Sequence, residues 1–329
     1  MQQRHKYIFK RVGFTGLSLY IIATFLFLMF RILPGDPAYA VFQPGMSVEA
    51  QNSLREQFGL NQPLYIQYLK YIENLLQGNL GMSFSHREPV SSILVERTLN
   101  TLTLSLTAVV LAFVFGTLIG AYLSWKRGTK IDTIGIGAVL ALRSAPAFWT
   151  GMLAIMIFSF NLELFPTGGM RSIDYAGTGL FARYLSVDFL WHLALPLMVT
   201  GLYYLSIPAF IMRNNMIDVL GDDYILMARA VGVSELSILY RHAARNALLP
   251  VFHYAGVMIG FAFGGSVVIE TVFSWPGVGR MMWTAVTDSN YPLAQGAFLM
   301  IALVIMMMNL VVDILSVYVD PRASVGGGE

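Results

Sequence analysis

Apolar residues in this chain are gathered into blocks of bilayer length, separated by shorter polar stretches. Six windows are long and apolar enough to cross about 30 Å of hydrocarbon as helices; they cover roughly 12–33, 98–125, 133–160, 190–212, 251–273 and 294–319. The second window opens with threonine and serine alternating with apolar residues, a pattern that also suits a strand. Its continuation through "AVVLAFVFGTLIGAYL" favours a helix, because a lone strand in lipid leaves its backbone groups unpaired. The pattern predicts an all-α polytopic membrane protein with six spans.

The composition supports this class. Of the 329 residues, 56% are hydrophobic and 12% are charged, about half the charged share usual in soluble domains. The chain has no cysteine, which excludes disulfides, thiolate metal sites and cysteine nucleophiles.

Lysine and arginine set the expected orientation. Basic residues precede the first apolar run and recur near 126–130 and 213–245. All of these stretches lie on one side of the membrane, and they carry a higher density of positive charge than the stretches on the other side. Because cytoplasmic loops are richer in lysine and arginine, the N- and C-termini are expected in the cytoplasm. We therefore expect a multi-pass membrane protein with both termini in the cytoplasm. The N-terminus also resembles a signal peptide, with "AYA" at 38–40 in the place of a cleavage site. The apolar run is longer than a typical signal core, and "LPGDP" separates it from those small residues, which indicates an uncleaved first span.

Two long stretches do not span. Residues 34–96 follow the N-terminus and first span (1–33) and are expected outside, where "SVEAQNSLREQFGL" and "PLYIQYLKYIENLLQG" predict a small helical insertion. This insertion either receives a partner protein or is anchored at the lipid interface by its aromatic residues, Tyr65, Tyr68, Tyr71 and Phe84. Residues 97–319 form a five-helix core, which includes a cytoplasmic loop at 213–250, and 320–329 form a cytoplasmic tail.

The loop contains a short, basic, helix-turn-helix pattern at 222–250. Asp222 and Asp223 suit the start of a helix, where carboxylates cap free amides and meet the positive end of the dipole. Gly232 suits the left-handed end of that helix, and Ser234 suits the start of the next. Pro250 is expected in the first turn of the following span. The second helix has an apolar face of Leu236, Leu239, Tyr240, Ala243 and Ala247, opposite a polar face of Arg241, His242, Arg245 and Asn246.

Two helices this short must pack on something to be stable. The loop is either a connector whose basic face lies on lipid phosphates or a docking element that inserts into a partner and transmits its movement.

Other candidates lie within the spans. Arg143 either lines a pathway, where it meets carboxylates of a cargo, or ends a helix and pairs with a neighbouring subunit, and Pro146 predicts a bend beside it. Pro196 and Pro208 predict bends in the fourth span that serve either gating or packing. A stripe of glycines every four residues permits close helix packing against a partner that the sequence does not identify: Gly256, Gly260 and Gly264.

The chemistry of catalysis is absent from the pattern. No G-x-x-x-x-G-K motif is present, so energy for any transport comes from a partner or from an ion gradient. A gradient-driven transporter needs ionisable groups in its spans, and the candidates occur singly: Arg143, His192, Glu270 and Asp313. No nucleophile elbow, metalloprotease helix or spaced metal ligands occur either. We expect no enzyme activity, no metal site and no nucleic-acid partner.

The loop sequence "ARAVGVSELSILYRHAARNALLP" resembles the coupling loop of ABC importer permeases of the peptide and nickel branch. Ala228, Gly232, Leu249 and Pro250 match that motif, whereas Leu226 and Met227 replace its usual Glu-Ala start. Further segments in the same order resemble the dipeptide/oligopeptide permeases, in particular the B-type subunit that carries "LPGDP": "RILPGDPA", "ERTLNTLTLSLTA", "ETVFSWPGVGRMM", "YPLAQGA" and "DPR".

This resemblance implies a type I ABC importer permease fold and a set of partners. The partners are a second homologous permease, two cytoplasmic ATPases that bind ATP and Mg, and an extracytoplasmic substrate-binding protein. The implied cargo is a dipeptide or oligopeptide, with nickel chelates or oligosaccharides as alternatives. The residues implied to couple to the ATPases are Asp223, Ala228, Arg229, Gly232, Ser234, Leu249 and Pro250.

Overall fold

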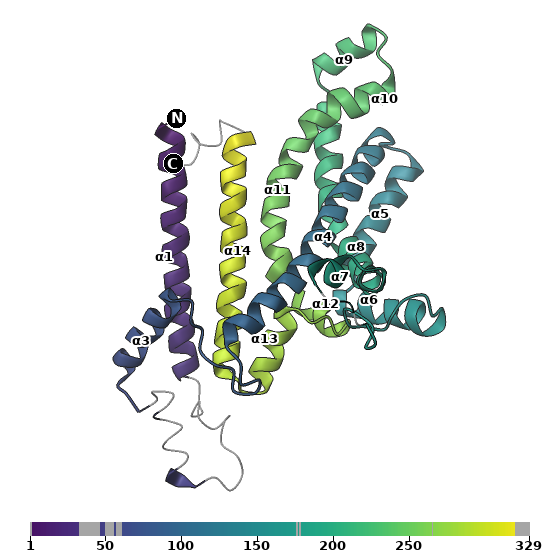
Figure 1. Ribbon diagram of the computed structural model, residues 1–329. Helices are drawn as coiled ribbons and strands as arrows, with labels where there is room; N and C mark the ends of the chain where they lie inside the picture. The colour runs from purple at the N-terminus through teal and green to yellow at the C-terminus, as the bar shows by residue number, and fades with distance from the viewer. Residues whose placement is uncertain are drawn as a thin grey trace. The chain divides into compact units, whose positions relative to one another are not determined.

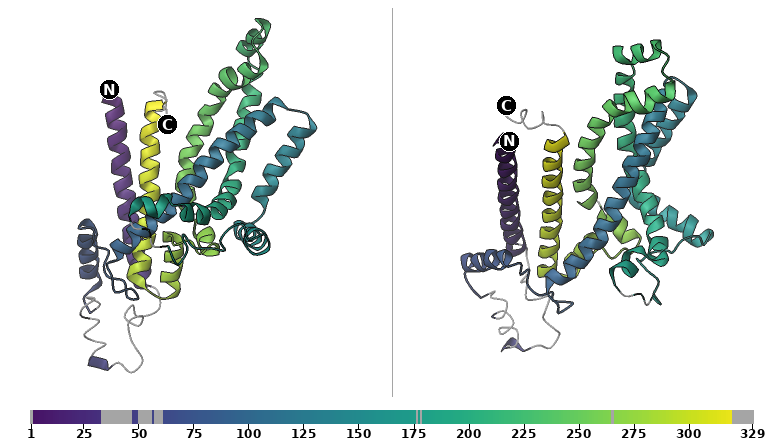
Figure 2. Two further views of the ribbon diagram at one scale, coloured as in Figure 1. Left: turned by 45° about the vertical axis from the view of Figure 1, so that its right-hand side comes forward. Right: turned by 45° about the horizontal axis from the view of Figure 1, so that its top comes forward.

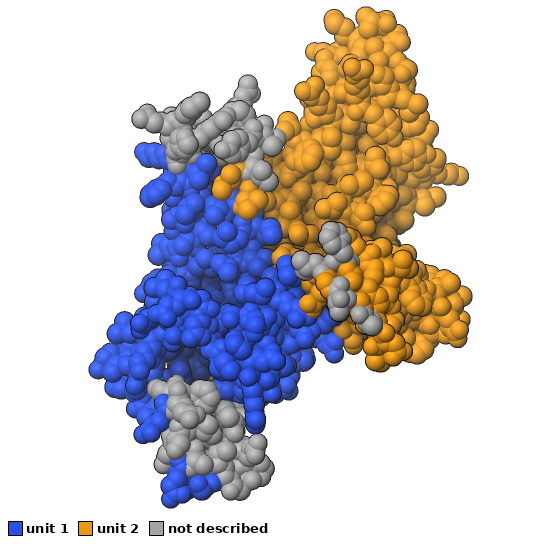
Figure 3. All heavy atoms as spheres, in the orientation of Figure 1, with its two compact units in different colours: residues 1–101, 276–310 blue, residues 102–275, 311–329 orange. Residues whose placement is uncertain are grey.

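A computed structural model describes residues 2–32, 47–49, 56, 61–175, 177, 179–264 and 266–319. Every regular element in these residues is a helix, apart from an isolated bridge between Met82 and Pro89. The chain divides into two compact units, coloured separately in Figure 3. Unit 1 is Met1–Thr101 with Pro276–Leu310, and unit 2 is Leu102–Trp275 with Val311–Glu329. The all-α expectation is confirmed for the described residues, and the strand alternative at the second window is wrong because α4 covers it as a helix.

Unit 1 contains the N-terminal span and the outer helix. Its elements are α1 (Gln2–Ile32), α3 (Leu64–Leu76), the first part of α4 (Val90–Trp125), α13 (Val278–Thr287) and most of α14 (Tyr291–Val319). The helix expected from "PLYIQYLKYIENLLQG" is confirmed as α3, which lies against α1 in Figures 1 and 2. The Phe27 ring lies 5.3 Å from that of Tyr68, and Thr24 Oγ1 is hydrogen-bonded to Tyr68 Oη at 2.8 Å. Most of "SVEAQNSLREQFGL", like "LPGDP" and the tail, lies outside the described residues.

Unit 2 contains the rest of the bundle. Its elements are the remainder of α4, then α5 (Lys130–Ser144), α6 (Ala147–Ala154), η2 (Ile155–Asn161), α7 (Leu180–Leu185), α8 (Val187–Val219), α9 (Asp223–Ala230), α10 (Glu235–Ser237), η3 (Ile238–Ala243), α11 (Ala244–Gly264) and α12 (Ser266–Val272). The elements η2 and η3 are π-helices. Helices α9 and α10 lie at one end of this unit, and α6, α7 and α12 lie at the other (Figures 1 and 2).

Four described helices are long and apolar enough to cross a membrane: Lys6–Arg31, Val90–Trp125, Val187–Val219 and Tyr291–Ile314. A fifth crossing is the pair Lys130–Ser144 and Ala147–Asn161, if these count as one span despite a 96° bend. The bend expected at Pro146 therefore exists as a break, because Pro146 precedes α6 instead of continuing α5. The window 251–273 falls on α11 and α12. Position 265, between these two helices, lies outside the described residues. Six spans remain a prediction.

Helices α4 and α8 approach each other through two glycines that the sequence reading did not single out. A Cβ atom at Gly116 would lie 2.7 Å from Leu205 O and 2.8 Å from the Pro208 ring. One turn further, a Cβ at Gly120 would lie 3.0 Å from Met212 Cβ. Small residues four apart allow membrane helices to pack this closely. Pro208 is therefore a packing residue here, and both Pro196 and Pro208 lie inside one continuous helix.

Candidate coupling site at the end of unit 2

A buried apolar platform holds the 222–250 region on the bundle. Ile225 of α9 and Ile238 of η3 are fully buried with Met216 of α8. Their cluster continues into α4 and α11 through small and aliphatic residues, Ala121, Met212, Leu239, Ala243, Ala244, Ala247 and Val251. Burying side chains of this size contributes about 1.5–3 kcal/mol for each large one. This platform supplies the packing that two isolated short helices would lack.

The turn between α9 and α10 forms as the sequence predicts. Gly232 has a φ of +83°, so the expected left-handed glycine is confirmed. The turn closes with hydrogen bonds from Gly232 N to Arg229 O at 3.0 Å and from Val233 N to Ala228 O at 3.1 Å. These bonds satisfy carbonyls at the end of α9 that would otherwise lack partners.

The predicted side-chain caps do not form. Asp222 and Ser234 occupy the positions that precede α9 and α10, but neither side chain accepts a capping hydrogen bond. Asp223 lies in the first turn of α9, where its charge still faces the positive end of the helix dipole.

The expected second short helix is wrong as a separate element. Residues 235–264 run without a break through α10, η3 and α11. Pro250 consequently lies inside α11, and not in the first turn of a new span. The chain passes from α10 into α11 through η3 without a loop, since π-helical turns are inserted into α-helices as local bulges.

The predicted apolar face is split by this π-helix. Leu239, Ala243 and Ala247 are buried as expected, whereas Leu236 and Tyr240 are exposed. A π-helix has more residues per turn than the 3.6 on which the face was predicted, so residues on either side of it no longer align.

The exposed residues form a surface that we call the apolar tip: Leu226, Met227, Val231, Leu236 and Tyr240. Met227 is 70% exposed and Val231 is 74% exposed. Exposed large apolar side chains of this kind are available to contact a partner protein or the membrane. The sequence reading treated Leu226 and Met227 only as a departure from the coupling motif and did not identify the other tip residues as a contact surface.

Polar contacts fix the tip. The guanidinium of Arg229 donates to the Glu235 carboxylate, with Nε to Oε1 at 2.9 Å and Nη2 to Oε2 at 3.3 Å. Asn246 Nδ2 donates to Tyr224 Oη at 2.8 Å. The Arg229 pair is solvent-exposed and contributes little to stability. Its two parallel hydrogen bonds instead fix the relative orientation of α9 and α10.

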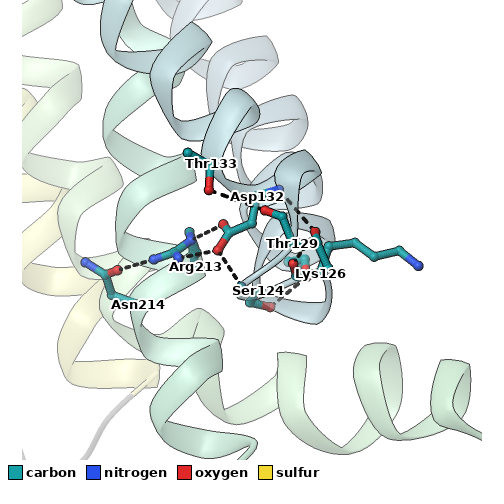
Figure 4. Close-up of polar contacts among 9 residues, drawn as sticks. Ser124, Lys126, Thr129, Asp132, Thr133, Arg213 and Asn214 are labelled. Carbon is teal, nitrogen blue, oxygen red and sulfur yellow. Dashed lines mark hydrogen bonds and ion pairs between the residues drawn. The ribbon is translucent and has the colours of Figure 1, made fainter.

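An ion pair braces the same end of the unit. Arg213 of α8 donates from Nε to Asp132 Oδ1 and from Nη2 to Asp132 Oδ2, each at 2.8 Å (Figure 4). Gly128 N also donates to Asp132 Oδ2 at 3.2 Å, and Thr129 Oγ1 caps α5 by accepting from Asp132 N. The sequence analysis did not pair these residues, which are 81 positions apart.

The remaining candidates are dispersed. Leu249 and Pro250 are exposed on α11. Arg143 is exposed in the last turn of α5, directly before the break at Pro146, and forms no ion pair with another described residue. Of the glycine stripe, Gly256 packs on α14, since a Cβ there would overlap the Val312 side chain. Gly260 is buried, whereas Gly264 is exposed.

Comparison with known proteins identifies the class. Residues 98–325 match the family described as binding-protein-dependent transport system inner membrane component, and residues 4–107 match the N-terminal family of the same transport systems. The chain belongs to this family and is a multi-pass inner membrane permease subunit of a binding-protein-dependent ABC importer. It is 37% identical over 315 residues to the glutathione transport system permease protein GsiC of Salmonella paratyphi A, covering 96% of this chain and 97% of that protein. The GsiC protein of Escherichia coli strain K12 is 36% identical over 315 residues, which again cover 96% of this chain and 97% of that protein. Permeases of this class are not themselves catalytic and work with a substrate-binding protein and ATPase subunits.

Proposed function

We propose that this chain forms half of the translocation pathway of an ATP-driven peptide importer. The other half is a second, homologous permease, and an extracytoplasmic binding protein delivers the cargo. The relatives named above transport glutathione, which is a tripeptide, and this supports a small peptide as cargo. ATP and Mg are bound by two cytoplasmic ATPases, and this chain holds no cofactor of its own.

The observation that carries the proposal is the apolar tip on its buried platform. Ile225 and Ile238 fix α9 and η3 to α8, so a force on the tip moves the platform and not the tip alone. The exposed side chains of Met227 and Val231 offer the contact surface to which an ATPase groove binds. Closure of two ATPases around bound ATP then moves the end of the bundle as a body.

The topology follows from this assignment. The tip is cytoplasmic, as are the N-terminus and the tail at 320–329, and six spans place residues 34–96 outside. The exposed helix α3 belongs to that outer insertion, and residues 97–319 form the permease core. We further assign Arg143 to the pathway: its exposed guanidinium, beside the break at Pro146, is available to a peptide carboxylate. We also assign Pro196 and Pro208 to gating, with α8 flexing at these two prolines, and the stripe at Gly256, Gly260 and Gly264 to helix packing.

Single cysteines test the proposal cleanly, because the chain has none of its own. In the assembled complex, Met227→Cys and Val231→Cys should crosslink to an ATPase subunit through a short bifunctional maleimide. Leu76→Cys, which is 85% exposed on α3, is the matched control and should not. A membrane-impermeant maleimide should label Leu76→Cys in intact cells and Met227→Cys only after the membrane is opened. Labelling of Met227→Cys from outside, or a tip that never crosslinks to an ATPase, would refute the assignment.

A further inference from the structure

Unit 1 contains a cavity that the coupling site does not explain. It has a volume of about 370 Å³ and is lined by the end of α1, one side of α3, residues 79–84 and the start of α14. Two apolar segments each have one end at the cavity: the segment in α1 ends at Arg31, and the segment in α14 begins at Tyr291. The cavity therefore lies at the depth where the hydrocarbon of the bilayer gives way to headgroups.

Its wall contains buried polar atoms without protein partners. Gln62 Oε1 is shielded from solvent and reaches no hydrogen-bond partner among the described residues; Tyr71 Oη and Gln295 Nε2 are shielded as well, and the Gln295 amide lies close enough to Tyr71 to lower its pKa. An unpaired buried donor or acceptor costs about 1–3 kcal/mol. Gln62 and the neighbouring Tyr71 and Gln295 therefore leave hydrogen-bonding capacity at this wall that a polar ligand would satisfy.

The charges around the cavity favour an anion. Arg31 and Lys70 line it, with Glu56 as the one described carboxylate, so one positive charge is in excess. Arg31 lies over the Phe27 ring at 5.6 Å and forms no ion pair with a described carboxylate. A half-buried guanidinium of this kind has five N–H groups to donate and no acceptor of its own.

The tyrosine is a donor throughout the physiological range. Burial raises the pKa of Tyr71 to about 12, and the neighbouring Gln295 amide offsets only part of this rise. The phenol consequently keeps its proton at neutral pH and can donate it to an acceptor oxygen.

We propose that this cavity binds a phosphate oxyanion, the phosphodiester of an outer-leaflet phospholipid headgroup. The single excess charge matches a phosphodiester monoanion, and Arg31, Lys70, Tyr71 and Gln295 supply the donors. Phe30, Leu75 and Leu299 on the same wall suit the glycerol and upper acyl carbons that accompany a headgroup. A free inorganic phosphate shares the recognition chemistry, and the experiment separates the two sources.

The test is lipid retention by the purified full-length chain. After delipidation in detergent, the chain is titrated with phosphatidylglycerol, with a glycolipid that has the same acyl chains but no phosphate, and with inorganic phosphate. Bound lipid is counted by native mass spectrometry, and bound phosphate is measured by equilibrium dialysis. The proposal predicts that each chain binds one phosphatidylglycerol tightly and binds the glycolipid at least tenfold more weakly. Phosphate binding as tight as that of phosphatidylglycerol would support the oxyanion site but assign it to a free anion.

Two variants locate the site. Arg31→Gln should weaken phosphatidylglycerol binding about tenfold or more, because a hydrogen bond to a charged group is lost. Tyr71→Phe keeps the shape of the wall and should weaken binding several-fold, which keeps the test valid if the arginine variant fails to fold. Lys10→Gln removes an exposed cation elsewhere on α1 and should have no effect. Equal retention of phosphatidylglycerol and glycolipid, or unchanged binding in both cavity variants, would overturn the proposal.

Discussion

Asp132 and Arg213 join the start of α5 to the C-terminal part of α8 through two parallel hydrogen bonds of 2.8 Å (Figure 4). The carboxylate is buried, and the bidentate geometry fixes both the distance and the angle between the two helices. Because α8 leads directly into α9, this pair holds the base from which the apolar tip projects. Under the proposed coupling role, movement delivered at the tip would reach α5 through this pair, and through α5 the break before Pro146.

The first prediction concerns this pair. Asp132→Asn removes the charge and leaves the Arg213 guanidinium short of a partner, which should cost about 1.5–3 kcal/mol. The assembled complex should melt at a lower temperature, and binding-protein-stimulated ATP hydrolysis should fall more than basal hydrolysis. Exchanging the residues, Asp132→Arg with Arg213→Asp, should recover part of both losses. Equal damage in the single and exchanged variants would show that the two side chains do not act as a pair.

The second prediction concerns the turn before α10. Gly232 has a φ of +83°, and a Cβ there would meet no atom within 4 Å, so only backbone strain opposes a side chain. Gly232→Val should cost about 1–2 kcal/mol locally and reorient the tip. Substrate-stimulated ATP hydrolysis should be lost while the complex still assembles. Gly137→Val is the control, since Gly137 has equally open space without a positive φ. Unchanged stimulation in an assembled Gly232 variant would count against the coupling role.

The third prediction concerns the contact of α11 with α14. Gly256→Ala places a methyl group against Val312 and should destabilise the protein by about 1–3 kcal/mol. Adding Val312→Ala should recover much of this loss, because the overlapping methyl groups are removed. Gly16→Ala on α1 adds the same methyl into open space and should change stability by less than about 0.5 kcal/mol. Thermal melts in detergent of the wild type, Gly256→Ala, Val312→Ala and the double variant form the cycle, and strictly additive effects of the two substitutions would contradict this contact.

The fourth prediction separates backbone contacts from side-chain contacts. Gly116 packs against the carbonyl oxygen of Leu205 as well as the Pro208 ring. Gly116→Ala should therefore destabilise the complex, and Pro208→Ala should not rescue it, because the carbonyl remains in place. Melting temperatures of the single and double variants measure this. Full recovery in the double variant would mean that the ring, and not the backbone, sets the approach of α4 and α8.

Much of the fold follows from the spacing of apolar residues alone. The windows at 12–33, 98–125, 190–212 and 294–319 each fall on a described helix that can cross a membrane. Pro146 was correctly expected to bend the third window, but the angle of the bend could not be predicted. A proline ends or kinks a helix depending on what packs around it, and here the outcome is a 96° break.

The site was predictable only in part. Gly232 needed a left-handed backbone, and a sequence can indicate that because few residues adopt it. The merging of η3 into α11 could not be inferred, since a π-helix leaves no periodic pattern of its own. The Asp132 pair depends on tertiary packing across 81 positions, which local patterns do not report. The apolar tip became visible once the structure separated Leu236 and Tyr240 from their buried neighbours.

Uptake and ATP hydrolysis measured together in vesicles that contain the whole complex test the central claim most directly. Met227→Asp with Val231→Asp places two charges on the apolar tip without touching the buried platform. Uptake of a labelled small peptide should fall at least tenfold, and the binding protein should no longer stimulate ATP hydrolysis. Leu76→Asp on α3 should leave both unchanged. Wild-type uptake and stimulation in the doubly charged tip variant would contradict the account.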